Sequence, residues 1–596
     1  MITRFRADLS ALPLTEKPVM EKLGTLLRSR IEERCGARRE ESRDAYCLSF
    51  RLEEGLPREG YRIAEAPNGL VISGGDFPAL AYGLGRFLHS ARYTETGFEP
   101  GAFRGISAPD CPFRVIYFAI HFYNWYYNTD AGELERYLED MLLWGYNGVA
   151  GILAKANLEG PDDPNTEIAL QRLEKLYAAA RRLEMLTVFQ FGNPDFRKSD
   201  PALAADKSGI HCKTGNLICP GKPAGFAYIR DLEVSLVKRL AKTGVDMISY
   251  FPYDEGGCSC RLCAPWGGNG YYRMARELHK EFRRFLPEVK AMLSCWHFNM
   301  GINDPRDFPW LDRAIREDRE RGLDWVDYVM VDCRNGVPPY VREHGVPGGC
   351  LGVDFPEISM YELRPWGAFG ANPLPKTFER IWRDCADTVQ GGMPYSEGKY
   401  EDINKVLYAG FFWDKGRSAE DILKDYAGYE FPGASAEEVI RLTEMIEENH
   451  LRTGKKRLEK PEPELYAEAE ALGRKLDGEL LPCVRGSWRW RILYLRSKLD
   501  ALRYRSCQGR AWPAEELKTK LSSYGYWGVG LERDEEAQAA FRELVEIFEM
   551  PEEFDPRKHF GHHMLRPLLS LGSTEADAAR TELAELLRTD PQALDR

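Results

Sequence analysis

A short apolar segment followed by a helical stretch recurs eight times between residues 112 and 415, and this repeat restricts the fold more than any other feature. Each apolar segment has the composition of a β-strand and ends in polar or aromatic residues, and most are followed by an amphipathic helical pattern. Eight such units in about 300 residues match the size of a (β/α)8 TIM barrel. The predicted strands span residues 114–122, 147–153, 186–193, 245–255, 289–298, 326–333, 348–360 and 389–398.

The regions on either side of this repeat have a different character. Residues 1–108 combine a helical start, the β-like segments YRIAEA and GLVISG, and the amphipathic stretch FPALAYGLGRFLHSAR, which together predict a small α/β domain. Beyond the repeat, strand patterns nearly vanish, and amphipathic helices are predicted at SAEDILKDYAGYEF, ASAEEVIRLTEMIEENH, WRILYLRSKLDALRYR and DEEAQAAFRELVEIF. We therefore expect an α/β protein with an N-terminal α/β domain (1–108), a catalytic barrel (109–415) and a C-terminal helical domain (416–596).

Composition and charge exclude several classes of protein. The 596 residues are 43% hydrophobic and 29% charged, which supplies enough apolar surface for packed cores and argues against a disordered chain. A formal net charge of -12 gives no electrostatic reason to bind nucleic acid or an acidic membrane surface. The start MITRFRADLSALPL lacks the apolar core of a secretory signal, and no run of about 18 apolar residues occurs, so the sequence predicts a cytoplasmic protein.

Polar and aromatic residues collect where the predicted strands end. In a barrel of parallel strands these ends meet at one mouth, where reactive groups are found. Aromatic rings can stack on sugar rings while acids and amides bind sugar hydroxyls, so this set favours a carbohydrate ligand over a phosphate. The candidate substrate-binding residues are His121, Asn124, Trp125, Asn193, Tyr253, Trp296, His297, Asp332, Glu357, Trp366, Tyr395 and Glu397.

The segment YFPYDEGG contains the strongest catalytic candidates. Asp254 and Glu255 are neighbouring carboxylates at the end of the fourth strand, and the two glycines that follow allow the backbone to turn. Glycoside hydrolysis needs a protonated acid at the leaving oxygen and a second group that manages positive charge at the anomeric carbon. Where the substrate's own 2-acetamido group is that second group, a protein carboxylate orients and stabilises it. We predict that Asp254 and Glu255 are catalytic.

The order of a small α/β domain, a barrel with an Asp–Glu pair after strand four and a helical tail resembles the retaining β-N-acetylhexosaminidases of glycoside hydrolase family 20. The likeness rests on GLVISGGDFPALAYGLGRFL, on Asp254 and Glu255, and on Arg114 at the barrel entrance. It implies that Asp254 orients the acetamido group and that Glu255 is the general acid and base. The chain departs from this family where Pro252 and Tyr253 precede the pair in place of the usual glycines.

The resemblance implies an exo-acting hydrolase that releases a terminal β-linked GalNAc or GlcNAc from an oligosaccharide or glycoconjugate by substrate-assisted, retaining catalysis. No cofactor is expected for this chemistry, and a homo-oligomeric state stays open. The layout also resembles the α-glucuronidases of family 67, in which Glu255 would be the acid and Asp332 or Glu357 the base of an inverting reaction. Arg114 and Arg334 would then be candidates to bind the uronate carboxylate. A third alternative is a carbohydrate-binding barrel without activity.

A cluster of cysteines follows the acidic pair. The segment CSCRLC contributes Cys258, Cys260 and Cys263, and Cys219 lies in the loop after the third strand. Four thiolates form a closed structural zinc site rather than a catalytic one, and such a site would hold the loop that carries Glu255. The alternative is a set of reduced cysteines packed in a loop, as is common in a reducing compartment.

Overall fold

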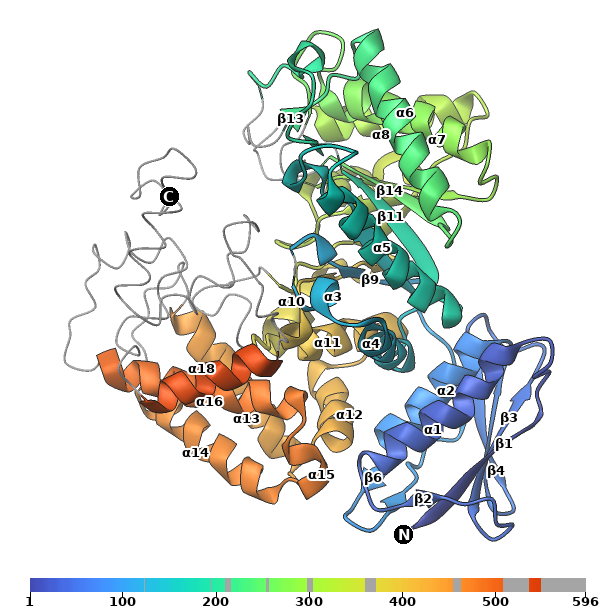
Figure 1. The fold of residues 1–596 in the computed structure, drawn as a ribbon, viewed down its shortest axis with the longest axis vertical. Helices are drawn as coiled ribbons and strands as arrows, with labels where there is room; N and C mark the ends of the chain where they lie inside the picture. Colours follow the sequence, from blue (N-terminus) through green and yellow to red (C-terminus); the bar gives the residue numbers. More distant parts are fainter. Residues whose placement is uncertain are drawn as a thin grey trace.

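The middle of the chain forms a closed barrel of eight parallel strands surrounded by helices, as the sequence predicts (Figure 1). The computed structural model describes residues 1–122, 124–192, 194–209, 216–252, 257–296, 298, 304–359, 371–453, 463–507 and 535–547. Strand β9 pairs with β10 on one side and with β18 and β19 on the other, which closes the sheet. The last two are parts of one eighth strand, interrupted at Pro394, whose nitrogen has no hydrogen to donate to the sheet.

All eight predicted strands are confirmed. Each observed strand lies within its predicted range or differs from it by a single residue. The observed bounds are β9 (Phe113–Phe118), β10 (Gly148–Ile152), β11 (Leu186–Gly192), β14 (Met247–Phe251), β15 (Lys290–Ser294), β16 (Tyr328–Val331), β17 (Leu351–Asp354), β18 (Gly391–Gly392) and β19 (Tyr395–Ser396).

A helix follows each strand and covers the outside of the barrel. The side chains of Asp130 and Asp163 cap the first two of these helices by accepting backbone N–H groups, and Gly145 ends the first helix in a left-handed conformation. The sixth helix is the shortest because its sequence, RNGVPPYVREHG, is rich in helix breakers. The helices are α4 (Ala131–Trp144), α5 (Pro164–Arg182), α6 (Pro223–Leu240), α7 (Tyr272–Arg283), α8 (Asp307–Glu320), α9 (Pro339–His344), α10 (Pro375–Cys385) and α11 (Asp402–Trp413).

The N-terminal part is a mixed six-stranded sheet in the order β2-β1-β3-β5-β4-β8. The predicted segments YRIAEA and GLVISG pair as the antiparallel strands β4 and β5. Helices α1 (Lys22–Glu32) and α2 (Phe77–Ser90) pack on this sheet, and α2 also packs on α4 of the barrel, so these helices lie between sheet and barrel (Figure 1). The strands are β1 (Arg4–Ala11), β2 (Arg38–Arg39), β3 (Tyr46–Leu52), β4 (Tyr61–Ala66), β5 (Gly69–Gly74) and β8 (Gly105–Ser107).

Arg114 lies at the amino end of β9, opposite the mouth of the barrel. Its buried guanidinium donates to the carbonyl oxygens of Gly145 at 2.6 Å and Cys111 at 2.7 Å, and to the Glu59 carboxylate at 3.1 Å. Glu59 belongs to the N-terminal part of the chain. Arg114 therefore connects the base of the barrel to that part, and it lies at the wrong end of the barrel to bind a uronate carboxylate at the mouth.

The C-terminal part that the structure describes is helical. Four of its helices, α12, α13, α16 and α18, coincide with predicted ones, whereas α14 was not predicted. No helix in the described ranges is long and apolar enough to cross a membrane. The bounds are α12 (Ala419–Glu430), α13 (Ala436–Thr453), α14 (Pro463–Glu479), α15 (Pro482–Arg485), α16 (Trp488–Cys507) and α18 (Glu535–Ile547).

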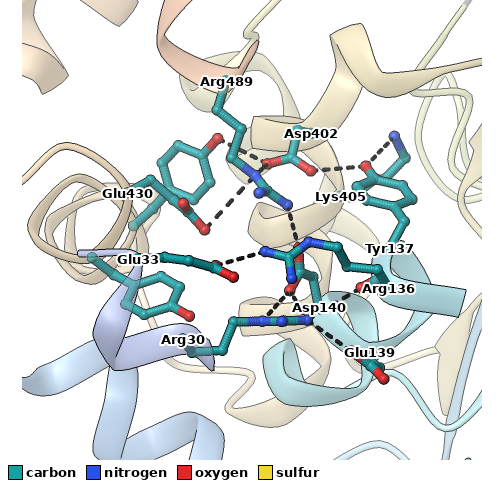
Figure 2. Close-up of polar contacts among 12 residues, drawn as sticks. Arg30, Glu33, Arg136, Tyr137, Glu139, Asp140, Asp402, Lys405, Glu430 and Arg489 are labelled. Carbon is teal, nitrogen blue, oxygen red and sulfur yellow. Dashed lines mark hydrogen bonds and ion pairs between the residues drawn. The ribbon is translucent and has the colours of Figure 1, made fainter. Parts of the chain in front are cut away.

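A buried ion network joins the N-terminal, barrel and C-terminal parts (Figure 2). Arg489 at the start of α16 donates to Asp402 of α11 at 2.7 Å and to Asp140 of α4 at 2.9 Å. Arg30 of α1 donates to the other oxygen of Asp140 at 2.9 Å. Burial alone would raise the pKa of Asp140, but Arg30 and Arg489 outweigh it and hold this pKa well below its usual range. Asp140 is therefore ionised, and Arg489 binds carboxyl groups on two barrel helices.

Replacing Arg489 should destabilise the protein strongly. Arg489→Met leaves Asp140 and Asp402 buried with less compensating charge, and breaking a buried ion pair costs about 3 to 5 kcal/mol. Thermal unfolding monitored by circular dichroism at pH 7.5 should show a clearly lower midpoint. The matched control is Arg441→Met, because Arg441 and its partner Glu468 are both exposed and such a pair contributes less than about 1 kcal/mol. Equal midpoints for the two variants would contradict the role of the network.

Candidate functional site

A layer of aromatic rings fills the barrel interior just below its mouth, which is the end where the strands have their carboxyl termini. The rings of Tyr117 and Tyr395 stack with centroids 5.2 Å apart, and those of Phe251 and Trp296 stack at 5.7 Å. Phe355 meets Trp296 edge to face at 5.2 Å. Trp296 and Tyr395 keep the largest exposed fractions of the five, 6% and 8%. This aromatic layer forms a packed apolar floor below the mouth, and aromatic faces of this kind are the groups on which sugar rings stack.

Two carboxyl groups, Glu357 and Glu397, lie beside the aromatic layer. Glu357 forms an isolated parallel bridge with Tyr395, and the Tyr395 hydroxyl donates to Glu397 Oε1 at 2.9 Å. The Glu397 backbone N–H donates to the Ser359 hydroxyl at 2.9 Å and to Glu401 at 3.0 Å. Burial, together with the charges of Glu401 and Glu357, raises the pKa of Glu397 well above its usual range. The raised pKa favours the protonated form of Glu397, which can donate as well as accept a hydrogen bond.

Glu401 and Lys405 connect this acid to the buried ion network. Lys405 Nζ lies 3.7 Å from Glu401 and donates to the Tyr137 hydroxyl at 2.9 Å. That hydroxyl donates to Asp402 at 2.8 Å (Figure 2). Burial lowers the pKa of Lys405 to about 8, although Glu401 and Asp402 oppose this shift. Glu401 and Lys405 were not among the predicted site residues. The sequence pattern that could have indicated them is a pair of opposite charges four residues apart at the start of a mostly apolar helix.

The residues after the sixth strand add a second charged group to the mouth. Arg334 Nη2 lies 3.1 Å from Asp332 Oδ2, and the guanidinium carbon lies 4.2 Å from the centre of the Trp296 ring. Asp332 is buried, whereas the Arg334 side chain is 19% exposed. The mouth thus presents a cation above an aromatic ring as well as carboxyl groups.

Asp354, at the end of β17, is a fully buried acid below this surface. It accepts the backbone N–H groups of Cys333 at 3.1 Å and Phe355 at 2.7 Å. Burial raises the pKa of Asp354 to about 7, and the nearby Asp332 adds to the shift. Its carboxylate and the thiols of Cys333 and Cys385 lie within 4.8 Å of one another in the barrel wall.

The three candidate residues in the loop after β9 do not lie together: His121 lies near the aromatic layer, and the other two lie away from it. His121 is buried beside Tyr117, with ring centroids 6.2 Å apart, and burial lowers its pKa to about 3, so it is neutral near pH 7. Asn124 Nδ2 donates to the Ala119 carbonyl oxygen at 2.8 Å and so fixes the loop itself. Trp125 lies against Lys399, whose ammonium is 4.1 Å from the ring centre.

Trp125 faces a separate cavity on the outside of the barrel. This cavity has a volume of about 490 Å³ and lies between helices α1, α4 and α16. Lys399 lies above the rings of both Trp125 and Trp488. The structure therefore brings His121, Trp296, Asp332, Glu357, Tyr395 and Glu397 to the mouth and places Asn124 and Trp125 away from it.

The proposed catalytic pair and several other candidates lie outside the described residues. The preceding strand, β14, ends at Phe251 in the aromatic layer, and the buried residues Pro252 and Gly257 flank the segment in the sequence. The predicted residues outside the described ranges are Asn193, Tyr253, Asp254, Glu255, His297 and Trp366.

The four predicted cysteine ligands come together beside the mouth. The Sγ atom of Cys219 lies 3.5 Å from that of Cys258, 3.7 Å from that of Cys260 and 3.8 Å from that of Cys263. All four sulfur atoms lie within 4.8 Å of one another. The loops after β11 and β14 therefore meet at this cluster.

Comparison with known proteins identifies the fold as one that several glycoside hydrolases have. No family model and no curated protein matches the sequence. A family GH115 4-O-methyl-α-glucuronidase with specificity for decorated arabinogalactans is similar in structure over 96% of this chain and 79% of its own, with 13% identity and a TM-score of 0.59. A family GH89 hydrolase from Clostridium perfringens, in complex with its substrate GlcNAc-α-1,4-galactose, is similar over 94% and 71%, with 12% identity and a TM-score of 0.59.

A GH138 enzyme targeting pectin rhamnogalacturonan II is similar over 98% of this chain and 92% of its own, with 12% identity and a TM-score of 0.54. A family GH20 exo-β-N-acetylglucosaminidase from Vibrio harveyi reaches a TM-score of 0.49 over 72% of this chain, which is too low to support an assignment. These likenesses show a shared barrel fold, and the sugar specificity has to be argued from the residues of this chain.

Replacing Glu397 by glutamine should stabilise the protein at neutral pH. Native Glu397 keeps its proton above the unfolded pKa of about 4.3, whereas the unfolded chain releases it, so rising pH favours unfolding through this residue. Glutamine keeps a neutral side chain of the same shape and removes this penalty. The midpoint of thermal unfolding of Glu397→Gln should exceed that of the wild type at pH 7.5, and the gain should vanish near pH 4.

The control for this measurement is Glu420→Gln, whose side chain is 63% exposed in a surface pair with Lys424. It should leave the midpoint nearly unchanged at both pH values. A loss of stability in Glu397→Gln at pH 7.5 would show that the native state requires an ionised carboxylate at this position, contrary to the raised pKa.

Proposed function

We propose that this protein is a glycoside hydrolase whose active site is the mouth of the barrel. The observation that carries the proposal is the meeting of Glu357 and Glu397 at Tyr395, beside the aromatic layer that also contains Trp296. A sugar ring has an apolar face that matches an aromatic ring and hydroxyl groups that match carboxyl groups. The barrel shared with glycoside hydrolases of three families supports the reaction class by analogy.

Within this class, the proposed activity is exo-acting release of a terminal β-linked GalNAc or GlcNAc. Asp254 would orient the substrate's acetamido group, which attacks the anomeric carbon while Glu255 protonates the leaving oxygen. Glu255 would then remove a proton from the water that opens the cyclic intermediate, which restores the acid and retains the configuration. Support comes from the position of the pair in the sequence, three and four residues after Phe251 of the aromatic layer. In the protonated form that its raised pKa favours, Glu397 is suited to bind a sugar hydroxyl.

A panel of aryl glycosides tests this proposal. The wild type should cleave aryl β-N-acetylhexosaminides, and Glu255→Gln should lower kcat by about 10² to 10⁴-fold, because the amide cannot transfer the proton. Asp254→Ala should impair acetamido substrates with a similar loss. The matched control is Glu288→Gln, an exposed residue just before β15, which should retain wild-type turnover. Wild-type turnover in Glu255→Gln would refute the assigned acid, and sugar binding without turnover of any substrate would favour a non-catalytic barrel.

Arg334 favours a second candidate, an inverting α-glucuronidase. Its guanidinium lies at the mouth above Trp296, where it could bind a uronate carboxylate, and Glu357 would be available as the base. The panel should then show cleavage of an aryl α-glucuronide, with an inverted product observed by proton NMR. Arg334→Leu should raise KM for the uronide at least about tenfold, because the variant loses one charged hydrogen bond to the substrate. The KM for an uncharged aryl glycoside should stay the same. Turnover of hexosaminides alone would exclude this candidate.

A further inference from the structure

We propose that Cys219, Cys258, Cys260 and Cys263 bind a structural Zn²⁺ that joins the loops after β11 and β14. The three sulfur–sulfur distances from Cys219 are 3.5, 3.7 and 3.8 Å. With Zn–S bonds of about 2.3 Å, the edge of a regular tetrahedron of sulfurs is about 3.8 Å. A disulfide requires about 2.05 Å between its sulfurs, so these distances fit a shared metal ion better than a bonded pair.

The surroundings of the sulfurs are those of a built metal site. Cys219, Cys258 and Cys263 are almost fully buried, with exposed fractions of 1 to 2%. The backbone N–H of Asp206 points at Cys258 Sγ from 3.3 Å, a contact that stabilises a thiolate. Gly221 passes so close that a Cβ atom there would lie 2.9 Å from Cys263 Sγ, which explains a glycine at this position.

The chemistry of the ligand set favours zinc as the occupant. Four thiolates buried together would repel one another without a cation, and a tetrahedral set of four sulfurs is the usual environment of structural zinc. All four coordination positions are filled by protein, which leaves none for water or substrate. The metal would therefore hold the chain in place and take no part in bond cleavage.

The position of the site gives it a consequence for activity, and this step rests on the proposed function. Cys258 follows Glu255 by three residues, so the zinc would fix the segment directly after the proposed acid. Cys219 comes from the loop after β11, and the metal would hold that neighbouring loop to the same point. The expected result is a glycosidase that loses activity slowly in strong chelator although its reaction needs no metal.

Metal analysis of the purified full-length chain tests the site directly. The wild type should carry about one zinc per chain, and Cys219→Ser and Cys260→Ser should carry less than about 0.2. The control Cys350→Ser changes a buried cysteine on another loop and should keep one zinc. Cobalt substituted into the wild type should give the intense visible absorption of a tetrahedral tetrathiolate, and Cys260→Ser should weaken it.

Thiol labelling and glycosidase activity are two further measurements that test the zinc site separately from the proposed function. If the serine variants do not accumulate in soluble form, iodoacetamide labelling of the wild type decides, because these four thiols should react only after chelation. Zinc below about 0.1 per chain in protein produced with zinc, together with labelling that chelator does not change, would overturn the site. A protein that holds zinc but cleaves no glycoside would refute the proposed function and leave the zinc site standing.

Discussion

Closure of the parallel sheet is the constraint on which the rest of the structure depends. Because β9 pairs with both β10 and the last strand, all eight carboxyl ends must meet at one mouth. Tyr117 and Tyr395 stack although they lie at opposite ends of the barrel sequence, and Phe355 packs against both of these rings and against Trp296. The sheet thereby assembles a site from residues that no local segment could bring together.

The acids at this mouth are costly to bury, and the structure offsets the cost in two ways. The raised pKa of Glu397 favours its neutral form, while Glu401 behind it lies near Lys405 and accepts several hydrogen bonds. From Lys405, the contacts continue through Tyr137 and the buried ion network to helices outside the barrel. The C-terminal helices thus take part in holding the charged side of the site, which gives them a role beyond covering the barrel.

The sequence predicted the barrel because its strands are short apolar runs at regular spacing, a pattern that burial on both faces imposes. It missed α14, although alanine and glutamate favour a helix there, because the segment has few large apolar residues and so a weak amphipathic pattern. For the site, the predicted strand ends placed Trp296, Glu357, Tyr395 and Glu397 at one end of the barrel, where the structure also has them. The strand ends could not show that Trp125 faces away from the mouth. Its position depends on packing near α16, which is far away in the sequence and contributes Trp488 to the same cavity.

The most direct test of the account is a crystal structure of the Glu255→Gln variant with an N-acetylhexosamine-terminated disaccharide. The account predicts the terminal sugar in the barrel mouth, with one face on Trp296 or Tyr395 and hydroxyls within hydrogen-bond distance of Glu357 or Glu397. A disaccharide bound only in the cavity between α1, α4 and α16, or no bound sugar at saturating concentration, would contradict it.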